Sequence, residues 1–158
     1  MPEKMSLWGV GPRIGRWTFC YLAAAVAATL VWPAVFSIGF VARGYLTAAG
    51  GVLLLLALPL YVATVRAVAR AHREDRLVTT GPYAVCRHPL YALWILLIVP
   101  AVAAFLASWL VLTASLFMYV VTRVETRHEE AYLEQRFGEA YREYKRRVNA
   151  VLPTPRRR

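Results

Sequence analysis

The sequence predicts an all-helical integral membrane protein with about four transmembrane helices, followed by an amphipathic cytoplasmic helix at the C-terminal end. Of its 158 residues, 59% are hydrophobic, whereas a soluble domain averages about 45–50%. No Lys, Arg, Asp or Glu falls within residues 17–42, 44–65 or 88–122. Because a charged side chain near the bilayer centre costs roughly 2.5–3.5 kcal/mol, charge-free runs of this length indicate membrane spans.

The first span is predicted at residues 17–42, after a basic arm formed by residues 1–16. Pro33 is expected to kink this helix, since proline lacks the backbone N–H that would continue the hydrogen-bond ladder. Residues 17–31 also fit the apolar core of a signal peptide. The apolar run continues to Ala42, however, which is too long for such a core.

The other three spans lie in the second and third apolar runs. Residues 44–65 form one span, kinked at Pro59, which at about 1.5 Å per residue covers the roughly 30 Å hydrocarbon core. Residues 88–122 are too many for one span and slightly too few for two full spans with a turn. We therefore expect a hairpin of two short helices, at 89–104 and 108–122.

The distribution of Lys and Arg predicts the orientation. Three lie in the arm at residues 1–16, one at Arg43, five in residues 66–87, none in the hairpin turn, and ten from Arg123 onward. By the positive-inside rule, both termini and residues 66–87 face the cytoplasm. We expect a prokaryotic inner-membrane protein whose functional site lies at the cytoplasmic surface.

The segment after the last span, residues 123–148, is predicted to be an amphipathic helix. Its apolar residues recur at steps of three or four, which is helical spacing: Leu133, Phe137, Tyr141, Tyr144 and Val148. Glu129 continues this stripe one turn earlier and is expected to face inward. Gly138 is expected to weaken or break the helix midway.

Several functional classes are disfavoured. The net charge of +10 could suggest nucleic acid, but the basic residues flank apolar runs and do not form a face on a soluble fold. Cys20 and Cys86 form no CxxC pair, so neither a metal site nor a disulfide is expected. Gly9-Val10-Gly11 lacks the third glycine and the preceding strand of a nucleotide-binding loop.

One polar, turn-rich stretch separates the apolar runs: RLVTTGPYAVCRHPLY, at residues 76–91. Gly81-Pro82 and His88-Pro89 interrupt regular structure within it. Together with Glu129-Glu130 and the later Leu133 and Phe137-Gly138, these blocks resemble the isoprenylcysteine carboxyl methyltransferase family, to which membrane phospholipid and thiol methyltransferases are related. The resemblance covers roughly half the chain, from Arg76 to Pro153.

The resemblance implies a single methyltransferase domain over residues 1–158 that binds S-adenosylmethionine at the cytoplasmic membrane surface without a Rossmann domain. It assigns cofactor contacts to Leu77, Val78, Tyr83, His88, Pro89, Leu90, Tyr91 and Glu129. The chemistry is consistent, because a sulfonium and an ammonium group favour a carboxylate and aromatic faces. Methyl transfer is an in-line displacement, so orientation and electrostatics are the protein's contribution and no catalytic nucleophile is expected.

The adjacent acids Glu129 and Glu130 are expected to lie in different surroundings. Glu130 is expected on a solvated helix face, paired with Arg127 or Arg123 at helical spacing. Glu129 lies on the apolar stripe, where an unpaired carboxylate is costly, so we expect it to meet a cationic ligand.

Plainer interpretations remain open for the other residues. His88-Pro89 could simply end a loop and begin a helix, and Tyr83 and Tyr91 could be interfacial aromatics. A membrane reductase of the steroid-reductase kind would use NADPH and need basic side chains near the site, for which Arg70, Arg73 and Arg76 are candidates. A non-catalytic membrane scaffold is the third alternative.

One position departs from the family pattern. Carboxyl-methylating relatives carry a substrate-binding arginine four residues before the cofactor-binding glutamate, and this chain has Glu125 there, flanked by Arg123 and Arg127. A carboxylate would repel an anionic acceptor. We therefore expect an apolar, membrane-borne acceptor with an amine or a thiol, in preference to a prenylcysteine carboxylate, with Arg123 and Glu125 as candidate substrate contacts and membrane lipids as partners.

Overall fold

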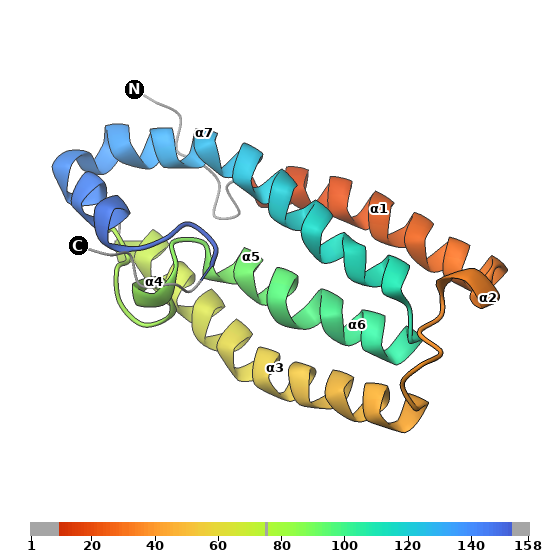
Figure 1. The fold of residues 1–158 in the computed structure, drawn as a ribbon. Coiled ribbons are helices and arrows are strands. Elements are labelled where there is room, and N and C mark those ends of the chain that lie inside the picture. The colour runs from red at the N-terminus through yellow and green to blue at the C-terminus, as the bar shows by residue number, and fades with distance from the viewer. Residues whose placement is uncertain (1–9, 75, 153–158) are drawn as a thin grey trace.

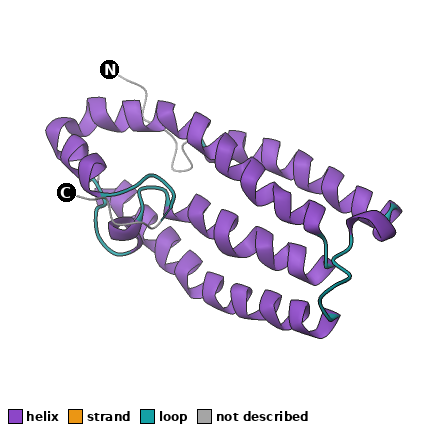
Figure 2. Ribbon diagram, viewed as in Figure 1, coloured by secondary structure: helices purple, strands orange, loops and turns teal. Residues whose placement is uncertain are grey.

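The structure, a computed structural model, describes residues 10–74 and 76–152 and consists of helices joined by short loops (Figure 1 and Figure 2). In chain order the elements are α1 (Gly11–Val31), α2 (Pro33–Phe36), α3 (Arg43–Glu74), α4 (Pro82–Val85), α5 (Pro89–Leu93), the π-helical turn η1 (Trp94–Ile98), α6 (Val99–Leu106) and α7 (Trp109–Arg147). The elements α5, η1 and α6 follow one another without a break and form one helix from Pro89 to Leu106.

Four helices are long and apolar enough to cross a membrane, which confirms the predicted number of spans: α1, α3, Pro89–Leu106 and α7. They lie side by side in one bundle, with α1 along α7 and α6 against both α3 and α7 (Figure 1). Large apolar side chains point outward from the bundle; Phe19, Leu30, Leu55 and Leu58 are each more than 60% exposed. Such an apolar exterior is suited to lipid.

The first helix differs from the predicted span in both bounds. It begins at Gly11 and ends at Val31, so Pro33 terminates it and does not kink it. A residue before proline is pushed out of the helical region, and Trp32 accordingly has φ −125° and ψ 63°. The short α2 follows, and the backbone N–H of Ile38 then donates to the carbonyl of Ala107, 2.7 Å away.

The second helix, α3, runs through Pro59 and continues to Glu74, nine residues beyond the predicted end at residue 65. The basic residues Arg66 and Arg70 are therefore part of the helix and do not lie in a loop. Charged residues end a membrane span, but they do not end a helix that leaves the membrane.

The predicted hairpin is confirmed, with its turn at Ala107 and Ser108. Ala107 adopts the left-handed conformation, with φ 48°, and the Ser108 hydroxyl caps α7 by accepting the N–H of Val111. The second arm is not a separate short helix, because α7 continues without interruption into the predicted cytoplasmic helix. Gly138 breaks it as expected, with φ 54° and ψ −128°, a conformation that is almost restricted to glycine.

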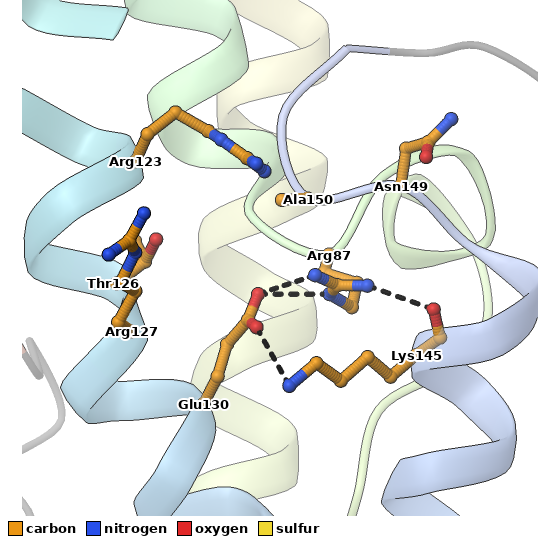
Figure 3. Close-up of a pocket in the computed structure, with 8 residues that line it drawn as sticks. All are labelled: Arg87, Arg123, Thr126, Arg127, Glu130, Lys145, Asn149 and Ala150. Atoms are coloured by element: carbon orange, nitrogen blue, oxygen red, sulfur yellow. Dashed lines mark hydrogen bonds and ion pairs between the residues drawn. The ribbon is translucent and has the colours of Figure 1, made fainter. Parts of the chain in front are cut away.

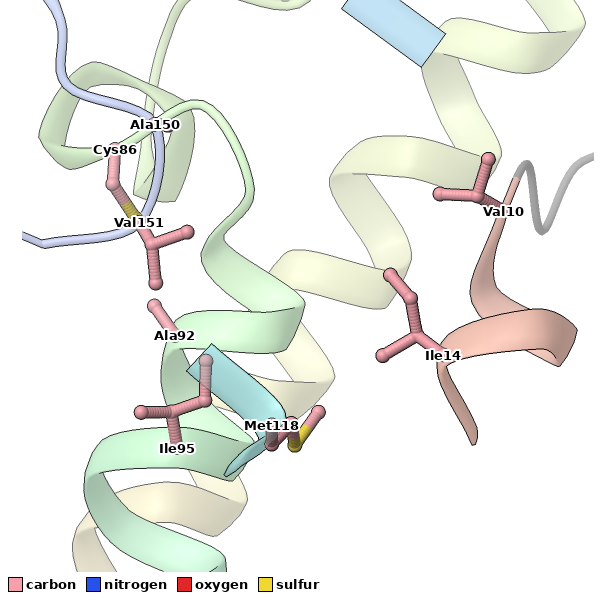
Figure 4. Packing of buried hydrophobic residues seen from close by; sticks show 8 residues of the cluster. All are labelled: Val10, Ile14, Cys86, Ala92, Ile95, Met118, Ala150 and Val151. Atoms are coloured by element: carbon pink, nitrogen blue, oxygen red, sulfur yellow. The ribbon is translucent and has the colours of Figure 1, made fainter. Parts of the chain in front are cut away.

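The break at Gly138 folds the last part of α7 back toward the bundle (Figure 1). We call the end of the bundle that holds this bend and residues 76–91 the polar end. A buried cluster joins the start of α1, residues 86–95, the early part of α7 and the C-terminal segment there (Figure 4): Val10, Ile14, Cys86, Ala92, Ile95, Met118, Ala150 and Val151. This packing holds the two segments of the candidate site against each other.

Candidate active site

The predicted site residues lie on two segments that meet at the polar end. From the first segment, Leu77, Val78, Tyr83, Leu90 and Tyr91 are half-buried, and His88 and Pro89 are buried. From α7, Glu129 is half-buried. Gly81, with φ 62°, turns the chain into α4. His88 then adopts a non-helical conformation, with φ −122° and ψ 63°, before Pro89, which begins α5 as the first helical residue.

A buried ion pair between Arg87 and Glu130 connects these segments (Figure 3). Two guanidinium nitrogens of Arg87 donate to Oε1 of Glu130, at 2.6 Å and 3.1 Å. The third nitrogen donates to the carbonyls of Lys145 and Val148, at 3.0 Å and 2.8 Å. One side chain therefore joins the loop before α5, the first part of α7 and its folded-back end.

The expectation that Glu130 faces solvent is wrong. Its side chain is only 11% exposed, and its partners are Arg87, His88 and Lys145, not Arg123 or Arg127. Burial alone would raise the pKa of Glu130, but hydrogen bonds from His88 and Arg87 outweigh burial and lower that pKa to about 2. Glu130 is therefore an ionised structural group in a part of α7 that lies beyond the charge-free run.

His88 contacts Glu130 of α7 and acts on Glu129 through its charge. Its Nε2 is 3.4 Å from Oε1 of Glu130, and its ring centroid is 5.9 Å from that of Tyr91. The backbone N–H groups of Arg87 and His88 donate to the carbonyls of Asn149 and Ala150, at 2.8 Å and 2.9 Å. These contacts fix the imidazole in a buried position.

Glu129 is the unusual group of the site. Its Oε2 is buried and has no hydrogen-bond partner among the residues that the structure describes. Burial raises the pKa of Glu129, against the opposing effects of His88 and of a backbone hydrogen bond from Val10. Burial, and then the charge of Glu129, raise the pKa of Tyr83, so the phenol lies within the field of this carboxylate. A buried carboxylate without a cation is a place where a cationic ligand would be stabilised.

Glu125, one helical turn before Glu129, pairs with a residue that the sequence did not indicate. Its side chain is 14% exposed, and Oε2 lies 3.5 Å from Nε of Arg13 in α1. That oxygen accepts no hydrogen bond from a described residue. Arg123 does not join this pair, because it lines a pocket with Arg87 on another face of α7.

Three further residues of the candidate site were not identified from the sequence. Arg87 holds Glu130, Lys145 adds a second cation at 3.3 Å, and the Tyr144 hydroxyl donates to the carbonyl of Tyr83 at 2.6 Å. Tyr144 was on the predicted apolar stripe, which is a signal of burial. Arg87 directly precedes His88-Pro89, but nothing in the sequence distinguishes it from the other basic residues of the 66–87 segment.

The sequence model of the phospholipid methyltransferase family matches residues 41–140, which include the 76–91 stretch, Glu125 and Glu129. The chain belongs to this family. Phospholipid methyltransferases and their relatives use S-adenosylmethionine as the methyl donor. The carboxylate of Glu129, whose buried Oε2 has no hydrogen-bond partner among the described residues, fits a ligand that carries a sulfonium and an ammonium group.

Two curated relatives match part of this phospholipid methyltransferase family member. The protein-S-isoprenylcysteine O-methyltransferase of Schizosaccharomyces pombe is 32% identical over 88 residues, which are 54% of this chain and 36% of that protein. The enzyme of the same name from Mus musculus is 34% identical over 88 residues, 54% of this chain and 31% of that protein. The match thus spans about a third of each relative's length. No solved structure matches the chain.

Proposed function

We propose that this protein transfers a methyl group from S-adenosylmethionine to an apolar acceptor that reaches the site from the membrane. The observation that carries the proposal is the carboxylate of Glu129, whose buried Oε2 has no hydrogen-bond partner within residues 10–74 and 76–152 and which acts on His88 and Tyr83 through its charge. Membership of the family indicates that the methyl donor is S-adenosylmethionine. The apolar exterior of the four helices supports an acceptor with a hydrocarbon body.

Different residues of the site hold different parts of the methyl donor. Glu129 provides the negative charge, and Tyr83 and Tyr91 provide aromatic faces that favour a cation. Leu77, Val78 and Leu90 form an apolar wall, and Pro89 fixes the turn that presents His88. The bound donor supplies a methyl group on a positively charged sulfur. The protein then has to orient the acceptor in line with that methyl group and exclude water, which accounts for the lack of a nucleophile in this scheme.

The surroundings of Glu125 favour an acceptor that can donate a hydrogen bond. An amine N–H can donate to the unpartnered Oε2 of Glu125, whereas a carboxylate has no proton to give. Arg13 partly compensates the negative charge of Glu125, so the repulsion of an anion is weaker than the sequence alone suggested. We infer that a lipid amine is the preferred acceptor, followed by an apolar thiol and then a prenylcysteine carboxylate.

This preference has a direct test. The purified protein, supplied with S-adenosylmethionine labelled on the methyl group, is expected to label a lipid amine or thiol more than a prenylcysteine. Glu125→Arg should move the ratio of products toward the carboxylate by about tenfold, since it replaces a like charge with an opposite one. Glu143→Arg, an exposed acid later on α7, is the matched control. An unchanged ratio in Glu125→Arg would show that Glu125 does not select the acceptor.

The reductase alternative has less support. Arg76, one of the three candidates for a phosphate contact, pairs with Glu74 at 2.7 Å, and the family match favours the methyl donor. S-adenosylhomocysteine, the donor without its methyl group, should therefore raise the thermal midpoint of the purified protein, and NADPH should not. Stabilisation by NADPH alone would replace the methyltransferase proposal with the reductase.

We infer that the polar end faces the cytoplasm of a prokaryotic inner membrane. Fusions of a topology reporter after Thr80 and after Arg158 are expected to give cytoplasmic activity, because these positions lie among the basic segments. A fusion in the Ala107–Ser108 turn, at the opposite end of the bundle, should give none. Opposite locations for the first two fusions would contradict the four-span arrangement.

A further inference from the structure

A pocket at the polar end is strongly cationic. It has a volume of about 310 Å³, and the residues that line it are Arg87, Arg123, Thr126, Arg127, Glu130, Lys145, Asn149 and Ala150 (Figure 3). Four of these side chains are cations and one is a carboxylate. None of the residues predicted to bind the methyl donor lines this pocket.

The helical geometry of α7 separates the pocket from the candidate active site. Arg123, Arg127 and Glu130 follow one another at steps of four and three residues, so they share one face of the helix. Glu125 and Glu129 are also one turn apart, but on a neighbouring face. The buried Arg87–Glu130 ion pair is part of the lining of the pocket.

The positive charge of the pocket is available for a ligand. Arg123 and Arg127 are exposed, and neither makes an ion pair or hydrogen bond with another residue of the described ranges. Arg123 reaches across the pocket toward Ala150 (Figure 3). The carboxylate of Glu130 does not cancel these charges, because Arg87 and Lys145 already pair with it, at 2.6 Å and 3.3 Å.

The pocket opens where the bilayer surface is expected. The charge-free run ends at Thr122. One row of α7, formed by Leu116, Val120 and Val124, is apolar and 53–67% exposed, which suits contact with lipid chains. Arg123 and Arg127 stand at the end of this row. Basic side chains at this level meet the anionic headgroups of the membrane.

We propose that this pocket binds the phosphate group of an anionic membrane lipid, at a site separate from the one that binds the methyl donor. A guanidinium group presents paired N–H donors that match the oxygens of a phosphate. The volume lies at the lower end of the range for ligand pockets, about 300–1,000 Å³, and is therefore large enough for a phosphorylated headgroup. The proposal does not depend on methyl transfer, since binding can be measured without it.

The test uses the full-length protein in detergent and a short-chain phosphatidylglycerol as the probe. Titration calorimetry should give a dissociation constant that is at least about tenfold larger for Arg123→Gln/Arg127→Gln than for the unmodified protein, because charge-assisted hydrogen bonds to the phosphate are lost. Short-chain phosphatidylcholine, whose choline carries a positive charge, should bind more weakly than phosphatidylglycerol. Inorganic phosphate should also bind more weakly, because it lacks the acyl chains that contact the apolar row.

Arg66→Gln/Arg70→Gln is the matched control, since it removes two exposed arginines of α3 that do not line the pocket. Equal loss of lipid affinity in both double variants would overturn the proposal and show a general effect of surface charge. A parallel loss of affinity for S-adenosylhomocysteine in Arg123→Gln/Arg127→Gln would overturn it as well, because the pocket would then belong to the donor site. Inorganic phosphate that binds as tightly as phosphatidylglycerol would exclude a lipid site.

Discussion

Replacing Arg87 by methionine is expected to lower the free energy of unfolding by about 3–5 kcal/mol, the usual cost of removing one partner of a buried ion pair. In the unmodified protein, the guanidinium of Arg87 lies 2.6 Å from the carboxylate of Glu130. The variant leaves this carboxylate buried without its nearest cation. It also leaves the carbonyls of Lys145 and Val148 without the guanidinium donor. Denaturation of the protein in detergent, followed by circular dichroism, measures this loss.

Two further variants separate a buried-pair effect from the loss of a charge. Arg142→Met removes an arginine that is 56% exposed and paired with Glu134 and Glu139, and should destabilise the protein much less than Arg87→Met, because exposed ion pairs contribute little. Arg87→Met combined with Glu130→Leu should recover part of the loss, because no unpaired charge is then buried. Equal effects of Arg87→Met and Arg142→Met would mean that the Arg87–Glu130 pair does not hold the polar end together.

Replacing Glu129 by glutamine is expected to abolish most of the stabilisation by S-adenosylhomocysteine. The substitution removes the negative charge that the cationic part of the ligand would contact, at a cost of roughly 1.5–3 kcal/mol, or about tenfold or more in affinity. The protein without ligand should be at least as stable as before, because an unpartnered carboxylate oxygen is no longer buried. Thermal midpoints with and without S-adenosylhomocysteine measure both effects.

The opposite signs of these two effects make the prediction specific to a binding site. Glu143→Gln, which changes an acid that is 58% exposed on the same helix, should alter neither the midpoint nor the response to the ligand. Affinity at the unmodified level in Glu129→Gln would show that Glu129 has no contact with the donor. A marked loss of stability without ligand would assign it a structural role similar to that of Glu130.

Much of the architecture could be predicted because charge is excluded from the bilayer. The charge-free runs located four helices, and the length of the third run indicated the hairpin whose turn is at Ala107. The same signal could not locate the ends of helices. Trp32 and Pro33 interrupt α1 inside an apolar run, and α3 continues past Arg66 because a helix does not need lipid to persist.

At the site, periodicity placed Glu129 correctly but assigned Glu130 to the wrong surface. Adjacent residues of a helix are about 100° apart, so both acids lie near the edge of the predicted buried face. Which of them obtains a cation depends on Arg87 and on Lys145, which the bend at Gly138 returns to the bundle. The contact between Glu125 and Arg13 also joins residues that are far apart in the sequence, and the periodic pattern of neither helix indicates it.

The hydrogen bonds between Arg87 or His88 and the segment that contains Asn149 and Ala150 have a consequence for biogenesis. Translation proceeds from the N-terminus, so all four helices are synthesised before Asn149 and Ala150, whose carbonyls accept the backbone N–H groups of Arg87 and His88. The contacts that join the candidate site to the C-terminal segment can therefore form only after residue 150 has been synthesised. A chain that stopped before Lys145 would insert its helices and still lack this site.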